Sequence, residues 1–415
     1  MKGNIYRRGE SWTYRFDLDP DPLTGQRRQA TKGGFGTRKE AESAMREAMS
    51  AAERGRHTRP SRRTVADFLD EWLKALNGRV RPTTWTSYRD YRDAYVNPAI
   101  GHTALQDLSP VRINLLYTRL LANGRVRKAA GIPAGLAPKT VRNVHVMLRR
   151  ALRDAVKWGY LARNPAEDAE PPTGHGRKRK VWTTEQLRAF VEHARGDRFF
   201  ALWLLVATTG LRRGELAGLR EEDFDLKAAR VSPAVPRVVV DGYAQDSEPK
   251  TARGYRTLAL DPVTAHAVQE HIKRWRAERR AVGHVSPLLF CWPDGQPVHP
   301  QTITDRFFRL SRDAGLPVIR LHDVRHSYAT AALKAGVHPK IVSERLGHAS
   351  VAFTLQTYSH VIEGMDEAAA VEIAAHILGT PPATDAPSPL GDPAETSDED
   401  DDDDDDGTSG MPLPA

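Results

Sequence analysis

Apolar residues recur at steps of three and four through the middle of the chain, a pattern that predicts amphipathic helices. The longest pattern lies between Pro138 and Trp158, and its apolar side consists of Val141, Val144, Leu148, Leu152 and Val156. Shorter helices are predicted over 65–76, from Thr83 or Thr84 onward, and from Ser109-Pro110 to Asn123-Gly124. Four helices with short connections predict an all-α domain at residues 64–163.

The first 57 residues follow a different pattern. Short β-prone runs rich in Tyr, Trp and Arg cover 4–8, 12–17 and 27–32, and the capping box of Thr37 and Glu40 then begins a helix. We expect a separate module, a three-stranded sheet with one helix, that binds a partner through basic side chains; a cap domain without that role is the alternative. The basic residues expected to contact DNA are Arg7, Arg8, Arg15, Arg27 and Arg28.

Helical and β-prone patterns are mixed in the third predicted domain, residues 181–378. Helices are predicted over 183–194, 199–209, 262–280 and, broken by glycines, 301–378, with β-prone runs at 229–232, 237–240 and 255–259. A fold that is mainly α with small antiparallel β-sheets follows. Residues 164–180 form a proline-containing linker that ends in the basic run Arg177, Lys178, Arg179 and Lys180. The charge of this run fits a linker that contacts the DNA backbone.

Charge divides the chain unequally. The whole chain carries +8, but the segment from His376 onward holds twelve carboxylates and no Lys or Arg, so the residues before it carry +20. A body this basic is typical of a protein that binds nucleic acid, although an arginine-rich composition from a GC-rich genome gives the same bias. We expect 379–415, with its prolines and nine consecutive acids, to be disordered; the tail either only aids solubility or competes with DNA for the basic body.

Cysteine content and hydropathy favour the cytoplasm. The high Arg and Ala content indicates a GC-rich bacterial host, where a protein that binds DNA is expected on the nucleoid. Cys291 is the only cysteine, so no intrachain disulfide can form. The most apolar run, 199–207, is about half the length that crosses a bilayer, so no contact with a membrane is expected.

Groups that can act on a phosphodiester are concentrated between Leu321 and Tyr358. Within these residues lie His322, Arg325, His348 and Tyr358. Two imidazoles, a fixed cation and a phenol are what an enzyme needs to attack a phosphodiester with its own side chain and without a metal. Farther upstream, the segment ATTGLRRGELAGL at 207–219 carries Arg212 and, about one helical turn later, Glu215.

These segments together resemble the tyrosine recombinase family, also called the phage integrase family. The resemblance rests on ATTGLRRGELAGL, LHDVRHSYAT, LGHAS and the tyrosine ten residues after His348, in the family's order and spacing. It covers about 181–378; the helical region before it resembles the family's core-site-binding domain, and the first 57 residues resemble its arm-site-binding domain. Glu221 and Gln356 depart from residues frequent in the family, but neither position is catalytic.

The resemblance implies a role for each site residue. Arg212 and Arg325 would clamp the scissile phosphate, and Tyr358 would be the nucleophile. His322 would hold a phosphate oxygen or accept the tyrosine proton, and His348 would donate to the phosphate or the nucleophile. Glu215 would orient neighbouring side chains. Lys250 would protonate the leaving 5′ oxygen, with Arg253 as the nearby alternative.

The implied reaction is DNA cleavage and rejoining through a 3′-phosphotyrosine, without metal, cofactor or ATP. The implied partners are double-stranded DNA at core and arm sites, three further copies of the chain, and possible assistance by an excisionase and a DNA-bending protein. Arg142 and Arg149 would contact phosphates, or else form a solvated helix face. A type IB topoisomerase, which relaxes DNA, and a DNA-binding regulator without catalysis are the alternatives. The apolar stripe of Met365, Ala369, Ile373 and Ile377 predicts a helix that docks on a neighbouring copy or packs within its own chain.

Overall fold

The computed structural model divides into two compact units, Met1–Gly174 and His175–Ala415. It describes residues 3–18, 20, 25–53, 61–126, 131–173, 180–248, 254–283, 286–348, 350–359 and 366–379. Several predictions lie outside these residues: those on Lys250, Arg253, Met365, the basic run 177–179 and the acidic tail from 380. None of the described helices is long and apolar enough to cross a membrane.

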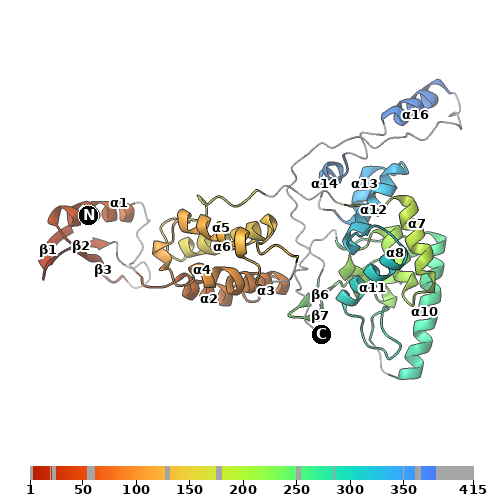
Figure 1. The fold of residues 1–415 in the computed structure, drawn as a ribbon, viewed down its shortest axis with the longest axis horizontal. Helices are drawn as coiled ribbons and strands as arrows, with labels where there is room; N and C mark the ends of the chain where they lie inside the picture. The colour runs from red at the N-terminus through yellow and green to blue at the C-terminus, as the bar shows by residue number, and fades with distance from the viewer. Residues whose placement is uncertain are drawn as a thin grey trace. The chain divides into compact units, whose positions relative to one another are not determined.

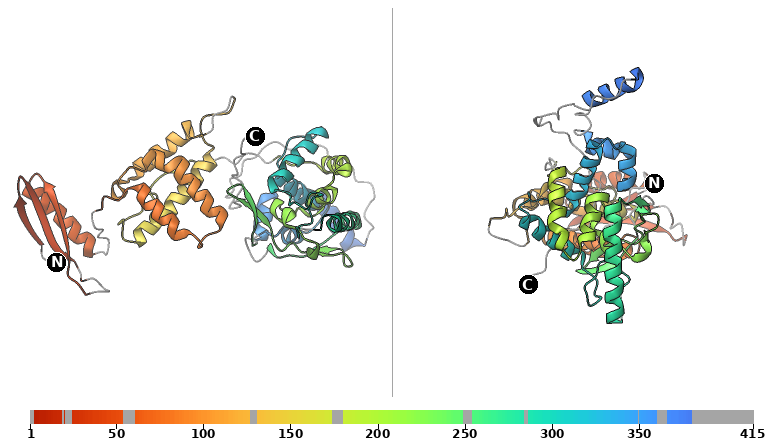
Figure 2. Two further views of the ribbon diagram at one scale, coloured as in Figure 1. Left: turned by 90° about the horizontal axis from the view of Figure 1, so that it is seen from below. Right: turned by 90° about the vertical axis from the view of Figure 1, so that its right-hand side faces the viewer.

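The N-terminal module is an antiparallel sheet with one helix along it (Figure 2). Its elements are β1 Gly3–Arg8, β2 Ser11–Leu18, β3 Arg28–Phe35 and α1 Arg38–Glu53. Tyr14 and Phe16 are buried with Ala30 and pack against Met45 of α1. The predicted cap is confirmed, because the Glu40 amide donates to Thr37 Oγ1 at 3.2 Å. On β2, exposed Arg15 alternates with these buried residues, so one strand supplies both a core face and a basic face.

The second part of the first unit is a helical bundle. It contains α2 Val65–Leu76, α3 Pro82–Tyr91, α4 Asn97–Ile100, α5 Pro110–Asn123 and α6 Pro138–Lys157. The expected start at Thr83 or Thr84 is wrong, because α3 begins at Pro82, whose fixed φ and missing N–H suit the first helical position. Arg92–Val96 forms a π-helical turn that joins α3 to α4. Pro98 accounts for it, since proline cannot donate to the helix and its ring displaces the preceding turn.

The expected apolar and aromatic faces meet in the core of this bundle. Val141, Val144, Leu148 and Leu152 of α6 are fully buried. Trp85, Tyr88, Tyr91 and Tyr95 are partly buried against the same cluster. Trp72, at the centre, donates from its indole to Asp154 at 2.8 Å. The polar atom of a buried aromatic ring is thereby paired, and α2 is fixed against α6.

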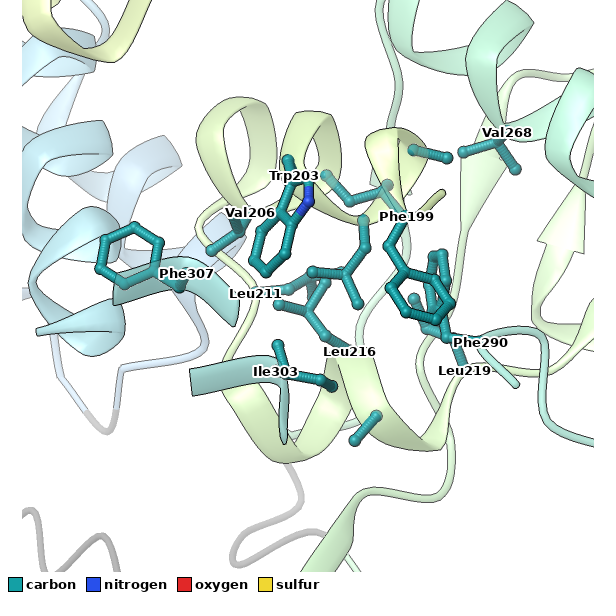
Figure 3. Packing of buried hydrophobic residues seen from close by; sticks show 14 of the residues in the cluster. Phe199, Trp203, Val206, Leu211, Leu216, Leu219, Val268, Phe290, Ile303 and Phe307 are labelled. Atoms are coloured by element: carbon teal, nitrogen blue, oxygen red, sulfur yellow. The ribbon is translucent and has the colours of Figure 1, made fainter. Parts of the chain in front are cut away.

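The second unit is organised around α8, Phe200–Thr209. This helix is buried on nearly all sides, and α7 Thr184–His193, α10 Pro262–Val282 and α12 Leu321–Lys334 pack against it (Figure 1). Figure 3 shows Trp203 and Val206 of α8 beside Leu211 and Leu216 from the segment that follows. The remaining helices are α9 Arg213–Gly218, α11 Pro300–Asp313, α13 Pro339–Leu346, α14 Val351–Thr357 and α16 Asp366–Leu378.

Two small antiparallel sheets lie between α9 and α10. One has three strands in the order β4 Phe224–Asp225, β5 Arg230–Val231 and β8 Leu258–Ala259; the other is a hairpin of β6 Arg237–Val240 and β7 Tyr243–Asp246. Strand β7 was not predicted. Asp241 and Gly242 both have positive φ, as a two-residue hairpin turn requires, and an Asp-Gly pair after a β-prone run is the signal that could have revealed it.

Candidate active site

Tyr358 lies directly after α14 and is only 3% exposed. Ser350 caps the start of this helix, and the tyrosine amide closes its last turn on the carbonyl of Thr354. The ring packs in a small apolar cluster with Ala329, Leu333, Val342 and Leu346. Its hydroxyl lies 2.8 Å from Nδ1 of His326. Burial fixes the ring, and the hydrogen bond fixes its hydroxyl oxygen.

Helix α12 supplies His322, Arg325 and His326. Positions three and four apart share a helix face, so these side chains leave the helix on the same side. The rings of His322 and His326 meet edge to face with their centroids 5.2 Å apart. A hydrogen bond connects α12 to Trp182, near the start of the second unit: the Trp182 amide donates to the Ser327 hydroxyl at 2.8 Å.

Arg212 is placed by the turn between α8 and α9. Gly210 ends α8 with φ +64°, and the flanking Leu211 and Leu216 are buried. Glu215 accepts from the Arg212 backbone amide at 2.8 Å and from its guanidinium at 3.2 Å. The buried side chains of Leu211 and Leu216, on both sides of Arg212, thus fix its backbone at the start of α9.

Arg256 contacts Glu215 from a different part of the chain, just before β8. It donates two hydrogen bonds of 2.9 Å to the two carboxylate oxygens, and both side chains are 8% exposed. Burial alone would raise the pKa of Glu215, but the hydrogen bonds and charge of Arg256, with the charges of Arg212 and Arg325, lower it to about 2. Glu215 is therefore ionised at neutral pH.

Three arginines converge on three successive carbonyls at the end of α13. Arg256 Nε donates to Arg345 O at 2.7 Å, Arg325 Nη2 to Leu346 O at 2.6 Å, and Arg212 Nη2 to Gly347 O at 3.4 Å. The last carbonyls of a helix lack partners within the helix and form the negative end of its dipole, so they attract cations. Arg325 also donates to Gly210 O at 2.9 Å, which joins the ends of α8 and α13.

His348 follows this helix end directly and is 5% exposed. Its Nδ1 lies 2.8 Å from Thr354 Oγ1, and its ring packs edge to face with Phe353. Burial, followed by the charges of Arg325 and Arg212, lowers the pKa of His348 to about 3. The imidazole is neutral at pH 7 and keeps one N–H for donation.

The site is suited to an anion, because three guanidinium groups face one carboxylate. Burial and the neighbouring charge of Arg212 lower the pKa of Arg325 to about 9. Arg325 is therefore still charged at pH 7. A phosphate would relieve the repulsion among these cations and accept from their planar donors. Among the residues that the structure describes, no group of three His, Cys, Asp or Glu side chains could hold a metal ion.

Most of the expected site residues lie around this charge cluster. Arg212, Glu215 and Arg325 interact electrostatically. His322 lies close enough to His348 to contribute to the lowering of its pKa. Sequence reasoning passed over Arg256 and His326. His326 directly follows Arg325 in LHDVRHSYAT and could have been noticed there. Arg256 is one of several arginines in a polar stretch, and no motif marks it.

The expected DNA-contact residues are exposed or half-exposed wherever the structure describes them. Arg7, Arg8 and Arg15 lie on the N-terminal sheet, where Arg15 stacks over the Tyr6 ring at 5.6 Å. Arg27 forms an ion pair with Asp17 at 2.9 Å. Arg28 is half-buried, and Arg142 and Lys180 are exposed.

A basic hollow of about 460 Å³ lies along α6. It is lined by Arg149, Arg150, Arg153 and Lys157, with Tyr88 of α3 beside them. Arg150 lies over the Tyr88 ring at 5.7 Å. Asp154 also lines the hollow, but four cations outnumber this one carboxylate, so the surface can receive the phosphates of a nucleic-acid backbone.

Comparison with protein families accounts for all three parts of the chain. Residues 180–364 match the phage integrase family, 4–51 an arm DNA-binding domain, and 64–121 the N-terminal SAM-like domain of phage integrases. The matches follow one another in the order of the three regions described above. Residues 180–364 belong to the phage integrase family.

Curated relatives agree with this family assignment along most of their length. A tyrosine recombinase XerC-like protein of Caldanaerobacter subterraneus subsp. tengcongensis is 27% identical over 349 residues, which cover 79% of this chain and 86% of the relative. An integrase of Streptomyces ambofaciens is 26% identical over 373 residues, covering 87% and 92% of the two chains.

Solved structures of integrases share the fold. The Tn1549 transposon integrase in complex with transposon right end DNA has a TM-score of 0.61 and 21% identity, covering 74% of this chain and 99% of that chain. A lambda integrase tetramer bound to a Holliday junction has a TM-score of 0.51 and 17% identity, covering 85% and 94%. The mainly helical, multidomain architecture with small antiparallel sheets that the sequence predicted is confirmed.

Proposed function

We propose that this phage integrase family member is a site-specific DNA recombinase that integrates or excises a mobile element. The observation that carries the proposal is the convergence of Arg212, Arg256 and Arg325 at the end of α13, in the unit that also buries Tyr358. A desolvated cation cluster that binds a phosphate, with a phenol held nearby, is the arrangement that phosphoryl transfer to tyrosine needs.

Each residue has a role in the proposed reaction. Arg212 and Arg325 hold the non-bridging oxygens of the scissile phosphate, and Glu215 keeps Arg212 in place. His348 donates its N–H to a phosphate oxygen, and His322 holds a second oxygen. Tyr358 attacks phosphorus and forms a 3′-phosphotyrosine, while the 5′ oxygen leaves with a proton from Lys250.

Electrostatic contacts elsewhere bring DNA to the site. The N-terminal sheet, with Arg7, Arg8 and Arg15, is proposed to bind arm sites, and the hollow around Arg149 to bind the core-site backbone. Four copies of the chain act together, as a lambda integrase tetramer does on a Holliday junction. In α16, Ile373 and Ile377 are 58% and 74% exposed, which favours docking on a neighbouring copy over packing within the chain. We place the protein in the bacterial cytoplasm, on its DNA.

The direct test uses nicked duplex DNA that carries the junction between the element's end and flanking DNA. Wild type and Tyr358→Phe are incubated with it without Mg²⁺, and the products are separated on a denaturing gel. A protein–DNA adduct from wild type alone supports the proposal. Binding without an adduct from either protein would instead favour a DNA-binding regulator, and relaxation of plasmids that lack the junction would favour a topoisomerase.

A further inference from the structure

The hydroxyl of Tyr358 and Nδ1 of His326 lie 2.8 Å apart. Both residues are buried, at 3% and 8% exposure, and their ring centroids are 6.0 Å apart. His326 lies on α12 and Tyr358 directly after α14, so the contact is made by the tertiary fold rather than by local geometry. This donor–acceptor distance is within the range for an O–H···N bond that can transfer a proton.

A tyrosine nucleophile needs a proton acceptor. Its phenol ordinarily has a pKa near 10, so it is neutral at pH 7 and a weak nucleophile until the O–H bond begins to break. The acceptor must be within about 2.6–3.2 Å of the oxygen. A neutral imidazole that carries its hydrogen on Nε2 accepts through Nδ1, the atom that faces Tyr358 in this chain.

We propose that His326 is the base that takes the proton of Tyr358, an inference that rests on the proposed recombinase function. The O–H bond of Tyr358 breaks and its proton moves to Nδ1, while the phenolic oxygen forms a bond to phosphorus. The bond from phosphorus to the 5′ oxygen breaks, and that oxygen takes a proton from the general acid, Lys250 in the proposed mechanism. Rejoining runs the same steps in reverse, with His326 returning the proton.

The geometry separates the tasks of the two neighbouring histidines. His322 lies one turn earlier on α12, is half-buried, and touches His326 with its ring. The sequence left two roles open for His322: holding a phosphate oxygen or accepting the tyrosine proton. Because His326 lies beside the hydroxyl, His322 is left to hold the phosphate oxygen.

The test measures adduct formation in a single turnover by the full chain on the nicked junction duplex described above. His326→Asn keeps a polar group near the Nδ1 position but cannot take a proton, so cleavage should slow by about 10²- to 10⁴-fold, the usual contribution of a general base. His326→Gly should be equally slow and should recover with added imidazole, which replaces the missing base. DNA binding by both variants should match wild type in a gel-shift titration.

Each outcome decides the proposal. Slow cleavage by both variants with imidazole rescue of the glycine variant supports it. Cleavage by His326→Asn within about threefold of wild type overturns it, because a general base contributes far more. Slow cleavage that imidazole does not restore also overturns it, since His326 would then only support the fold. His326→Gln serves in place of Asn if the latter unfolds. Absence of an adduct from wild type itself would overturn the recombinase function instead.

Discussion

Arg256 and Glu215 form a buried ion pair with two parallel hydrogen bonds of 2.9 Å. The pair connects three segments, because Glu215 also binds Arg212 at the start of α9 and Arg256 also binds the carbonyl of Arg345 in α13. Removal of either partner would leave a charge in a site that water barely reaches. The position of Arg212 thus depends on a residue 41 positions after Glu215.

Arg256→Lys should weaken both the fold and the reaction. Lysine keeps the charge but cannot make the planar two-point contact or the third bond to Arg345 O, so we expect a loss of roughly 1–3 kcal/mol in the free energy of unfolding. Adduct formation should fall at least about tenfold, as Arg212 loses its support. Urea denaturation and the nicked-DNA assay measure the two effects. The control is Arg312→Lys, whose pair with Asp313 is largely exposed and should shift stability by under about 0.5 kcal/mol.

Gly210→Ala should destabilise the second unit more than Gly336→Ala, at another glycine of that unit with positive φ. A Cβ at Gly210 would lie 2.7 Å from the Tyr328 ring and 2.8 Å from Leu346, and φ is +64°. The backbone strain of about 1 kcal/mol adds to an overpacking cost of about 1–3 kcal/mol. Gly336→Ala is the matched control, because its φ is +76° but nothing lies within 4 Å of the added Cβ. Equal losses of unfolding free energy in the two variants would contradict the packing argument.

Acid should destabilise the chain through its buried histidines. Burial, followed by the charges of Arg274 and Arg198 and opposed by a hydrogen bond to Leu289 O, lowers the pKa of His271 to about 4. Below pH 6.5 the unfolded chain binds a proton that folded His271 does not, so stability falls between pH 6.5 and about 4 and is unaffected above that window.

Calorimetry of wild type and His271→Gln at pH 7 and pH 5 checks this expectation. The glutamine variant lacks the titrating ring but can donate to the same carbonyl, so its Tm should drop less on acidification than that of wild type. His348, whose pKa is lowered to about 3, contributes in the same direction in both proteins. Identical drops would mean that His271 does not carry the effect.

Arg325→Lys should slow cleavage strongly while leaving DNA binding nearly intact. The guanidinium joins Gly210 O and Leu346 O at 2.9 and 2.6 Å and offers further donors to a phosphate, a geometry that an ammonium cannot reproduce. We expect adduct formation to fall by about 10²- to 10³-fold, as for the loss of an oriented donor to a transition-state oxygen. Near wild-type cleavage with unchanged affinity would remove Arg325 from the proposed clamp.

Deletion of residues 364–415 should prevent tetramer assembly on DNA and strand exchange. The helix α16 within this segment exposes Val371, Ile373, Ile377 and Leu378, apolar surface that a neighbouring copy would cover. Assembly can be followed by native gel electrophoresis of the protein with junction DNA.

Deletion of residues 380–415 alone is the control, and it should leave assembly unchanged. If the acidic tail competes with DNA for the basic body, this shorter deletion should also tighten nonspecific binding at low salt. Normal assembly by the longer deletion would show that α16 is not the docking element.

The sequence by itself determined the local elements and the family. The capping box of Thr37 with Glu40 and the pair Ser109-Pro110 predicted helix starts that the structure confirms, because capping depends on neighbouring residues alone. The bounds of short strands were harder to predict, because they depend on which residues pair with another strand. Of the predicted segment 255–259, only Leu258–Ala259 pairs.

Only the tertiary structure decided which charged and polar groups meet. The sequence named Arg212, Arg325, His348 and Tyr358 and placed Glu215 about one helical turn from Arg212, but it did not reveal Arg256 or His326. The contact of Arg256 with Glu215 spans 41 residues, and that of His326 with Tyr358 spans 32. Such contacts leave no periodic pattern in the chain, because they depend on how helix ends are brought together by burial of apolar side chains far from them.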